Sequence, residues 1–206
     1  MNPQELDPIP YDSQTAGVDE VGLGPLAGPV VAVALLLPDD FDTAGITDSK
    51  KMTEAAREKA YIRILDAGTV GIGIVDADEI DRRNILNATH HAMRLALTAL
   101  PSPPVRVLVD GLPVPDLHPN CEAIVKGDLR CSLIAAASVV AKVTRDRLMC
   151  EYHTLYPEYG FNRHKGYGTR LHLAALQENG PCPLHRRSFA PVSQLCLRFP
   201  EADTRP

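Results

Sequence analysis

The sequence predicts a layered α/β domain with a mixed sheet. Strand-like segments come first along the chain, and later strands alternate with segments of helical period, which is the order typical of sheet-and-helix layers. The chain has 206 residues, of which 45% are apolar and 23% are charged. That length is typical of one domain, or of one domain with a small appendage, and it is sufficient for a hydrophobic core.

Five segments have the pattern of strands. Residues 30–37 form a β-branched apolar run that fits a buried strand, and residues 69–75 alternate as a strand does. The segment 105–110 (VRVLVD) is the most strand-like of all, and it ends on a carboxylate. We expect two shorter strands at 16–21 and 121–125.

Four segments have helical composition or spacing. They are 53–66, 78–99, 131–152 and about 170–178. The third of them places a set of apolar residues on one stripe: Leu133, Ile134, Ala137, Val140, Ala141, Leu148 and Met149. The proline-rich residues 101–104 form a stiff connector that is too short to be a linker between domains.

Composition excludes several classes of protein. The longest uninterrupted apolar run is far shorter than the ~20 residues that a membrane-spanning helix needs. The first residues lack the basic and apolar regions of a secretion signal. The five cysteines are odd in number and form no CxxC pair, so neither a disulfide framework nor a zinc site is expected. We therefore expect a reduced cytoplasmic protein.

Charge is distributed unevenly along the chain, whose net charge is −5. Residues 1–120 contain 9 Lys and Arg against 18 Asp and Glu, whereas residues 121–190 contain 10 against 6. An acidic half beside a basic half suits a site that holds cations and attracts phosphates. Chance alone gives the same asymmetry in many domains of this size.

A glycine-rich loop, GLGPLAG at 22–28, follows the first expected strand. Gly-x-Gly after a strand is found in dinucleotide-binding sites, but that motif requires a helix to follow. Here Pro25 and Pro29 interrupt the segment and a β-branched run follows, so the loop connects two strands. Its glycines let the backbone approach a ligand closely, and a strained turn without a ligand is the alternative.

Four carboxylates lie at the ends of expected elements. They are Asp19 and Glu20 before the glycine loop, Asp110 at the end of a strand, and Asp128 before the long helix. Singly, each has an ordinary explanation as a solvated charge, a turn former or a helix cap. Together they would repel one another unless cations lay between them, and ligand sets made only of oxygen suit Mg²⁺ or Mn²⁺.

An ordered set of motifs runs along most of the chain. They are Asp19-Glu20-Val21-Gly22, Asp48-Ser49-Lys50-Lys51, Asp110-Gly111, Lys126-Gly127-Asp128, the helical run from Ile134 to Asp146, Tyr159-Gly160-Phe161, His164-Lys165-Gly166-Tyr167 and Arg186-Arg187-Ser188-Phe189. In this order the motifs resemble those of the ribonuclease HII family, and the resemblance covers about residues 16–192.

The resemblance implies a ribonuclease H-like fold, with a central mixed five-stranded sheet flanked by helices and a small C-terminal helical extension. We expect a flexible tail at 1–15, a catalytic core at 16–152, and an extension at 153–206 that contributes to substrate binding. The implied activity is that of an endonuclease on the RNA strand of RNA/DNA hybrids, which also incises duplex DNA 5′ to embedded ribonucleotides. Its products carry 3′-hydroxyl and 5′-phosphate ends. The implied catalytic residues, which are also the ligands of two Mg²⁺ or Mn²⁺ ions, are Asp19, Glu20, Asp110 and Asp128.

In that family, main-chain groups of a Gly-Arg-Gly triplet and a tyrosine read the ribose 2′-hydroxyl. The matching positions here are Gly22, Leu23, Gly24 and Tyr167, so leucine stands where the family has arginine. Backbone hydrogen bonds do not need that side chain, but its charged contact is lost. We therefore predict a relaxed preference for a single ribonucleotide in duplex DNA, with hybrid cleavage less affected.

Several polar residues are candidates for binding substrate phosphate. They are Lys50, Ser138, Lys142, Arg145 and Lys165. Three of them, Ser138, Lys142 and Arg145, are spaced to share one helical face. The alternative for Lys142 is an ion pair with Asp146 on a solvated face. If these residues bind phosphate, substrate affinity should fall steeply with salt.

Two alternative functions stay open. One is another two-metal nuclease of related fold, which would cut all-DNA substrates. The other is a catalytically weak or inactive nucleic-acid-binding homologue, which would bind hybrid without Mg²⁺-dependent cleavage. We expect a monomer without membrane contact. Whether a sliding clamp binds is left open, because residues 197–206 contain no clear interaction motif.

Overall fold

The computed structural model describes residues 9–196, without the side chain of Cys196. The first half of the expected tail, residues 1–8, and the C-terminal segment 197–206 lie outside the described residues. No helix within 9–196 is long and apolar enough to cross a membrane.

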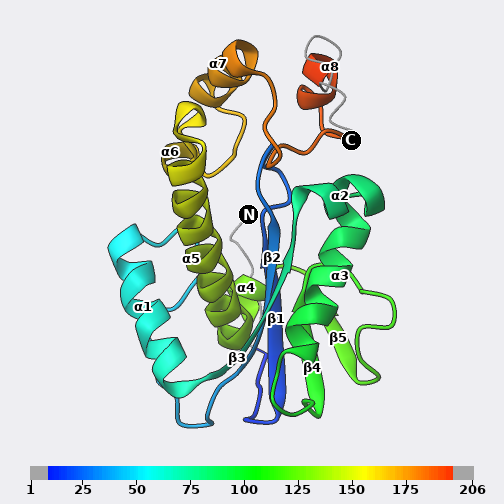
Figure 1. Ribbon diagram of the computed structural model, residues 1–206. Helices are drawn as coiled ribbons and strands as arrows, with labels where there is room; N and C mark the ends of the chain where they lie inside the picture. Colours follow the sequence, from blue (N-terminus) through cyan, green and yellow to red (C-terminus); the bar gives the residue numbers. More distant parts are fainter. Residues whose placement is uncertain (1–8, 197–206) are drawn as a thin grey trace, which may run out of the picture. The chain divides into compact units, whose positions relative to one another are not determined.

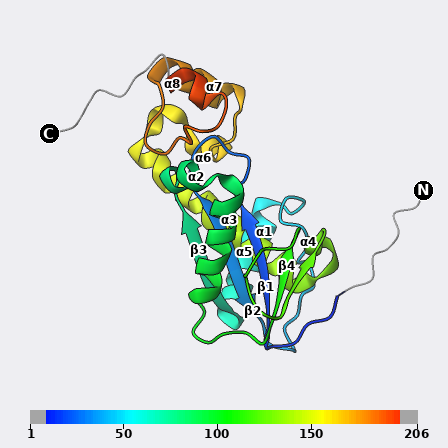
Figure 2. The same cartoon turned by 90° about the vertical axis from the view of Figure 1, so that its right-hand side faces the viewer.

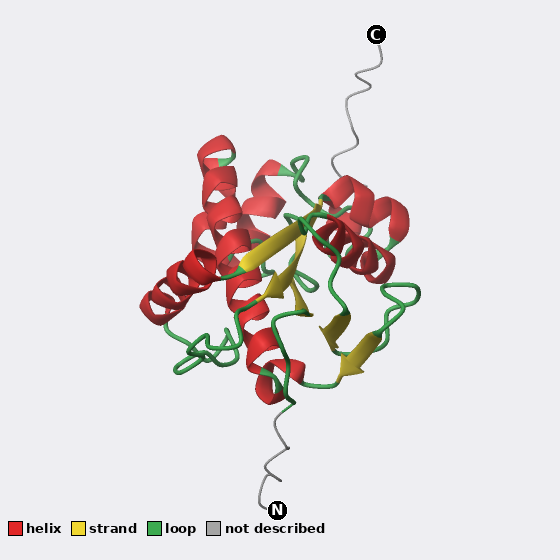
Figure 3. Cartoon of the chain, turned by 90° about the horizontal axis from the view of Figure 1, so that it is seen from below, coloured by secondary structure: helices red, strands yellow, loops and turns green. Residues whose placement is uncertain are grey.

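The predicted five-stranded mixed sheet is confirmed. Its strands are β1 (Thr15–Val21), β2 (Val30–Leu36), β3 (Thr69–Val75), β4 (Arg106–Asp110) and β5 (Cys121–Ile124), in the order β3-β2-β1-β4-β5. The strand β1 pairs antiparallel with β2 and parallel with β4, and β4 pairs parallel with β5. Figure 3 shows these strands side by side. The parallel pairing brings the C-terminal ends of β1 and β4 to the same edge of the sheet.

Three of the four expected helices form within a few residues of their predicted ends: α1 (Glu54–Ala67), α5 (Ser132–Leu155) and α7 (Arg170–Asn179). The segment 78–99 is helical, as its composition predicts, but it contains two helices. They are α2 (Ala77–Arg83) and α3 (Ile85–Thr98), separated by Asn84 at φ 66°. This positive φ is uncommon for a residue other than glycine, and the Asn84 side chain accepts a hydrogen bond from the Asn87 N–H at 3.1 Å, which caps α3.

Shorter helical segments fill the remaining connections. They are α4 (Gly127–Arg130), the 3₁₀ turn η1 (Pro157–Tyr159), α6 (Phe161–His164) and α8 (Val192–Cys196). In Figure 2, α7 and α8 lie beside each other, and Leu173 and Gln177 of α7 line a cavity together with Gln194 and Leu195 of α8.

The chain folds into two compact units whose segments interleave. The described parts of 1–21, 31–74 and 90–143 form the first, which we call the sheet unit. The segments 22–30, 75–89 and the described part of 144–206 form the second, which we call the helical unit. The expected domain boundaries at 15/16 and 152/153 stay a prediction.

Within the sheet unit, helices cover both faces of the sheet. Ala60 and Ile64 of α1 pack with Leu133 and Ala137 of α5 in one buried cluster, on one side of the strands (Figure 1). Two of the buried positions on β3, Gly71 and Gly73, are glycines. A methyl group added at Gly73 would lie 1.9 Å from the Ala92 carbonyl oxygen of α3, so the missing side chain lets that helix lie directly on the strand.

The helical unit has its own apolar core. It contains Leu26 and Ala27 of the glycine loop, Met149 of α5, and the stacked rings of Tyr159 and Phe161, whose centroids are 5.3 Å apart. The segment 22–30 is therefore anchored in the core of the helical unit through its second half.

Candidate active site

Two of the predicted carboxylates lie near the C-terminal end of β1. In the register with β2, Asp19 lies opposite Val33 and Glu20 opposite Ala32. The side chain of Asp19 is buried and that of Glu20 is half-buried. Asp19 Oδ1 accepts a hydrogen bond from the Glu20 N–H at 2.8 Å, which restrains the Asp19 carboxylate at the strand end.

The other two carboxylates come from the end of β4 and the turn after β5. Asp110 is the last residue of β4, and its Oδ1 accepts a hydrogen bond from the Gly127 N–H at 2.6 Å. Asp128 follows in the first turn of α4. A methyl group at residue 127 would lie 3.1 Å from Asp110 Oδ1 and 2.7 Å from Ile134 Cδ1, so glycine is needed for this close approach. The segment thus carries Asp128 to the end of β4.

The four carboxylates influence one another electrostatically. Burial, and next the charges of Glu20 and Asp110, raise the pKa of Asp19 well above its usual range. Burial and the Asp110 charge raise the pKa of Glu20 to about 7. The pKa of Asp128 is raised by burial and then by the charges of Asp110 and Asp48. The sheet unit therefore gathers these residues into one acidic cluster, as the positions of the strand ends predict.

The side chains of this acidic cluster are not arranged as a complete metal-binding site. Between residues 9 and 196 there is no group of three or more His, Cys, Asp or Glu side chains that could hold a metal ion as they stand. Repulsion between like charges favours such a spread arrangement. The role of the four residues as metal ligands therefore stays a prediction.

Two buried serines lie behind the cluster. The Ser138 and Ser49 hydroxyl oxygens are 2.8 Å apart, and a hydrogen bond with Ser138 acts to lower the pKa of Asp19. Ser138, predicted to bind substrate, thus has its hydroxyl engaged inside the protein, where it supports Asp19. Ser49 was missed as a functional residue. The only signal for it was its place in the Asp-Ser-Lys-Lys motif.

The lysine candidates differ in their surroundings. Lys50 is exposed, and its positive charge acts to lower the pKa values of Glu20 and Asp128. Lys142 is half-buried. The Lys165 ammonium donates to the Asn162 carbonyl and lies 3.6 Å from Cys150 Sγ. Phosphate binding by these three lysines stays a prediction.

The prediction that Arg145 binds phosphate is contradicted. Its side chain has no exposed surface, and its guanidinium donates to three backbone carbonyls, those of Ala27, Pro29 and Lys165. Helical spacing placed Arg145 on one face with Ser138 and Lys142, but spacing does not reveal which turn of a long helix is covered by other segments.

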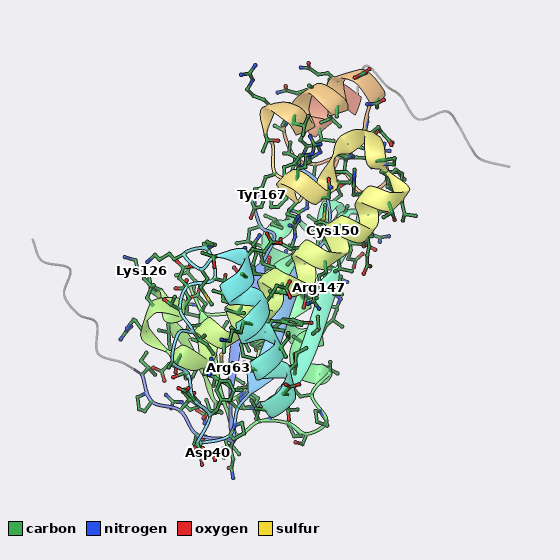
Figure 4. All side chains as sticks on the ribbon, turned by 90° about the vertical axis from the view of Figure 1, so that its left-hand side faces the viewer. Asp40, Arg63, Lys126, Arg147, Cys150 and Tyr167 are labelled. Atoms are coloured by element: carbon green, nitrogen blue, oxygen red, sulfur yellow. The ribbon has the colours of Figure 1, made fainter. Side chains whose placement is uncertain are left out.

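The glycine loop and Tyr167 lie together in the helical unit. A methyl group added at Gly24 would lie 4.0 Å from Tyr167 Cε1, and the Leu26 N–H donates to the Gly166 carbonyl at 2.9 Å. The side chains of Leu23 and Tyr167 are 44% and 40% exposed. Figure 4 shows Tyr167 at the surface of this unit. Of the residues predicted to read the sugar, Leu23, Gly24 and Tyr167 are therefore exposed, whereas Gly22 is buried.

The raised pKa of Glu20 predicts how stability depends on pH. Because the folded state holds the Glu20 proton more tightly than the unfolded chain, its contribution to stability is present below pH 4.5 and is lost as the pH rises to about 7. In metal-free protein this loss amounts to about 3 kcal/mol at most. Replacing Glu20 by Gln should remove it.

Urea unfolding at several pH values, with EDTA present, measures this effect as the difference between native protein and E20Q. The difference is needed because burial lowers the pKa values of His172 and His185 to about 4 and about 3, which makes stability rise with pH. The exposed Glu178 of α7 provides the control variant, E178Q. An equal pH dependence in native protein and E20Q would contradict the raised pKa.

Comparison with known proteins identifies the family. The family model described as Ribonuclease HII matches residues 16–192. The chain belongs to the ribonuclease HII family. It is 56% identical to a ribonuclease HII of Acidovorax sp. (strain JS42) over 188 residues, which cover 91% of this chain and 90% of the relative. It is 53% identical to that of Chlamydia abortus over 185 residues, covering 89% and 87%.

Solved structures agree with this ribonuclease HII assignment. The ribonuclease H2 of Pyrococcus horikoshii OT3 superposes with a TM-score of 0.72 at 27% identity, covering 90% of this chain and 98% of that one. The ribonuclease HII of Archaeoglobus fulgidus, solved in a complex with PCNA, has the same fold, with a TM-score of 0.69 at 24% identity over 85% and 94% of the two chains.

Family membership confirms the predicted fold and enzyme class. The chain is a hydrolase of the ribonuclease H type, an endoribonuclease of RNA/DNA hybrids. The alternative of a nuclease from another family is thereby excluded.

Proposed function

We propose that this ribonuclease HII cuts the RNA strand of hybrids and also incises duplex DNA on the 5′ side of an embedded ribonucleotide. The products carry 3′-hydroxyl and 5′-phosphate ends. The acidic cluster of Asp19, Glu20, Asp110 and Asp128 performs the hydrolysis with two divalent cations. The observation that carries this proposal is the gathering of these four carboxylates at one edge of the sheet, where burial and the charges of neighbouring carboxylates raise the pKa values of Asp19, Glu20 and Asp128.

The chemistry of the acidic cluster fits a divalent cation. Its donors are all carboxylate oxygens, which Mg²⁺ and Mn²⁺ prefer over softer metals. The raised pKa values of Asp19, Glu20 and Asp128 mean that nearby positive charge is insufficient, since Lys50 offsets only part of the repulsion. Bound cations would favour the ionised carboxylates and draw them together.

Backbone N–H groups orient two of the carboxylates in this cluster. The Glu20 N–H fixes Asp19 and the Gly127 N–H fixes Asp110, so that two carboxylates keep their orientation before any ligand binds. Two divalent ions supply activation of the attacking water and stabilisation of negative charge on the leaving oxygen. Lys50 adds positive charge for the substrate phosphate, and Lys142 and Lys165 are further phosphate contacts in this proposal.

Recognition of the ribose falls to the glycine loop and Tyr167. A protein distinguishes RNA from DNA at one position by hydrogen bonds to the 2′-hydroxyl. In this proposal backbone groups of Gly22, Leu23 and Gly24 form those bonds while Tyr167 lies against the sugar. The nearness of Gly24 to the Tyr167 ring supports this arrangement.

Replacing Leu23 by Arg should strengthen the preference for a single ribonucleotide in duplex DNA. The leucine side chain is 44% exposed, so a longer charged side chain fits without burial. We expect the ratio of kcat/KM on a single-ribonucleotide duplex to that on a long hybrid to rise about 10-fold, equivalent to about 1.4 kcal/mol. Steady-state kinetics on both substrates measure this ratio. Leu23→Met is the uncharged control, and an unchanged ratio in L23R would refute the hypothesis of relaxed preference.

One assay tests the proposed function as a whole. The native protein is incubated with Mg²⁺ or Mn²⁺ and with a long hybrid, a duplex containing one ribonucleotide, or an all-DNA duplex. We expect cleavage of the first two substrates, with the cut on the 5′ side of the ribonucleotide, and none of the third. Cleavage of all-DNA duplex, or binding of hybrid without cleavage with either ion, would contradict the proposal.

A sliding clamp is the protein partner that we propose to test. The Archaeoglobus fulgidus enzyme was solved in a complex with PCNA, and it has the same fold as this chain. Size-exclusion chromatography of the full chain with a sliding clamp should show co-elution. Separate elution at micromolar concentrations would count against this partner.

A further inference from the structure

Two arginines of the helical unit are wholly buried. Arg145 and Arg186 have no exposed surface and are the two largest side chains of which this is true among the described residues. A guanidinium carries five N–H donors and stays charged, so burying it is costly unless acceptors surround it. The acceptors of these two residues therefore indicate what they do.

Arg186 donates hydrogen bonds to carbonyls at both ends of the glycine loop. Its Nη2 donates to the Gly22 carbonyl at 2.6 Å, and its Nη1 donates to the Leu23 carbonyl at 3.1 Å. Its Nε and Nη2 both donate to the Gly28 carbonyl, at 3.0 and 2.9 Å. One side chain thus joins the two ends of the turn.

Arg145 donates hydrogen bonds to carbonyls in the second half of the same loop and just after it. Its Nε donates to the Pro29 carbonyl at 2.9 Å and its Nη2 to the Ala27 carbonyl at 3.1 Å. Its Nη1 donates to the Lys165 carbonyl at 2.9 Å, two residues before Tyr167. This arginine therefore connects the glycine loop to the segment that carries Tyr167.

The two guanidinium groups lie near each other. Burial, and next the Arg145 charge, lower the pKa of Arg186 to about 9, so Arg186 is still charged at neutral pH. Partly negative carbonyl oxygens of the loop surround this pair of like charges. The loop is consequently held with its carbonyls turned inward, because these hydrogen bonds are charge-assisted.

The inward carbonyls determine where the N–H groups point. A trans peptide unit is planar, so its N–H points opposite to its C=O. The carbonyls of Gly22 and Leu23 face Arg186, and the N–H groups of Leu23 and Gly24 therefore point away from it. Residues 23 and 24 are exposed, whereas Gly22 is buried.

Backbone hydrogen bonds also fix the turn that contains Arg186. The Asp81 carboxylate of α2 accepts hydrogen bonds from the Arg187 N–H at 2.7 Å and the Ser188 N–H at 3.0 Å. The Arg186 N–H donates to the Leu26 carbonyl at 2.9 Å. Arg186 is thus fixed by its backbone as well as by its side chain.

We propose that Arg145 and Arg186 are positioning residues for ribonucleotide recognition. By binding the carbonyls of the glycine loop, they aim the N–H groups of Leu23 and Gly24 outward and set the loop against Tyr167. The aimed N–H groups donate to an oxygen of the substrate at the ribonucleotide. This inference rests on the proposed recognition of ribose by the loop, but it concerns residues that do not touch the substrate.

The test compares Arg186→Lys and Arg145→Lys with native protein. Lysine keeps the charge but lacks the planar fork that reaches three carbonyls at once. We expect amide hydrogen exchange of Leu26 and Gly28 to become at least about 10-fold faster in each variant, because the loop loses part of its support. On a single-ribonucleotide duplex, kcat/KM should fall about 100-fold, mainly through kcat.

A matched control and a second readout separate positioning from general damage. Arg147→Lys changes an exposed arginine of the same helix and should leave exchange and rates unchanged (Figure 4). Mn²⁺-dependent thermal stabilisation should remain native in R186K and R145K, because the four carboxylates belong to the sheet unit. Native exchange in the loop together with native rates in both variants would overturn the proposal, and so would loss of Mn²⁺-dependent stabilisation.

The native protein provides a measurement that does not depend on the folding of a variant. The N–H groups of Leu23 and Gly24 should exchange fast in the free protein and be protected about 10-fold or more by a duplex with one ribonucleotide, but not by all-DNA duplex. Equal exchange with both duplexes overturns the inference. If the native protein cuts no ribonucleotide-containing substrate, the proposed function fails instead, while the effect of R186K on loop exchange still tests how the loop is held.

Discussion

Replacing Asp19 by Asn should lower kcat on every substrate by about 10³-fold, or about 4 kcal/mol, and Asp110→Asn should do the same. Each substitution removes one negative charge from the acidic cluster while keeping the shape of the side chain. Asparagine Oδ1 can still accept the hydrogen bond that Asp19 receives from the Glu20 N–H. The loss therefore reports the missing charge and not a collapsed strand end.

Stability distinguishes this loss of activity from misfolding. Since burial and neighbouring charges raise the pKa of Asp19, ionising it in the folded protein costs free energy at neutral pH. Metal-free D19N should therefore unfold at the same temperature as native protein or at a higher one. The exposed Asp66 of α1 gives a control, D66N, with native kcat. Substantial turnover by D19N or D110N would refute the assignment of the acidic cluster.

Replacing Gly22 by Ala should disable the glycine loop. Gly22 has φ 102°, and an added methyl group would lie 2.5 Å from Arg145 Nε and 2.7 Å from the Pro29 carbonyl oxygen. The backbone oxygen has little freedom to move, so the loop must shift. A displacement of this size should lower kcat/KM on a single-ribonucleotide duplex about 100-fold. Kinetics of G22A on single-ribonucleotide and hybrid substrates measure the loss.

Gly45 offers a matched comparison for the backbone strain alone. It has φ 79°, and an added methyl group would meet no atom within 4 Å. Gly45→Ala therefore costs only the left-handed conformation, about 1 kcal/mol, and should leave both rates unchanged. Native rates for G22A, or an equal loss for G45A, would show that the close contacts of Gly22 do not matter.

Most of the sheet could be predicted from the sequence because its strands have strong local patterns. The run at 30–37 and the segment VRVLVD are apolar and β-branched, and both form strands with nearly the expected ends. The break at Asn84 could not be predicted from helical composition, since a single residue with a positive φ interrupts an otherwise uniform segment. The one local signal for the break was the preference of asparagine for the position that caps the start of a helix.

The clustering of the four carboxylates could be predicted because each lies near the end of an element. The parallel pairing of β1 with β4 then brings Asp19 and Asp110 to one edge. The burial of Arg145 and Arg186 could not be predicted in this way. Both lie in charged stretches that are typical of a solvated face, and their burial depends on contacts with a loop more than 100 residues away in sequence.

Titration of the native protein with Mn²⁺, followed by electron paramagnetic resonance, tests the central claim most directly. If the acidic cluster holds the cations that drive hydrolysis, native protein with bound hybrid should take up about two Mn²⁺ ions per chain. The double variant D19N/D110N should lose both in the same concentration range. Equal Mn²⁺ uptake by native protein and double variant would contradict the account.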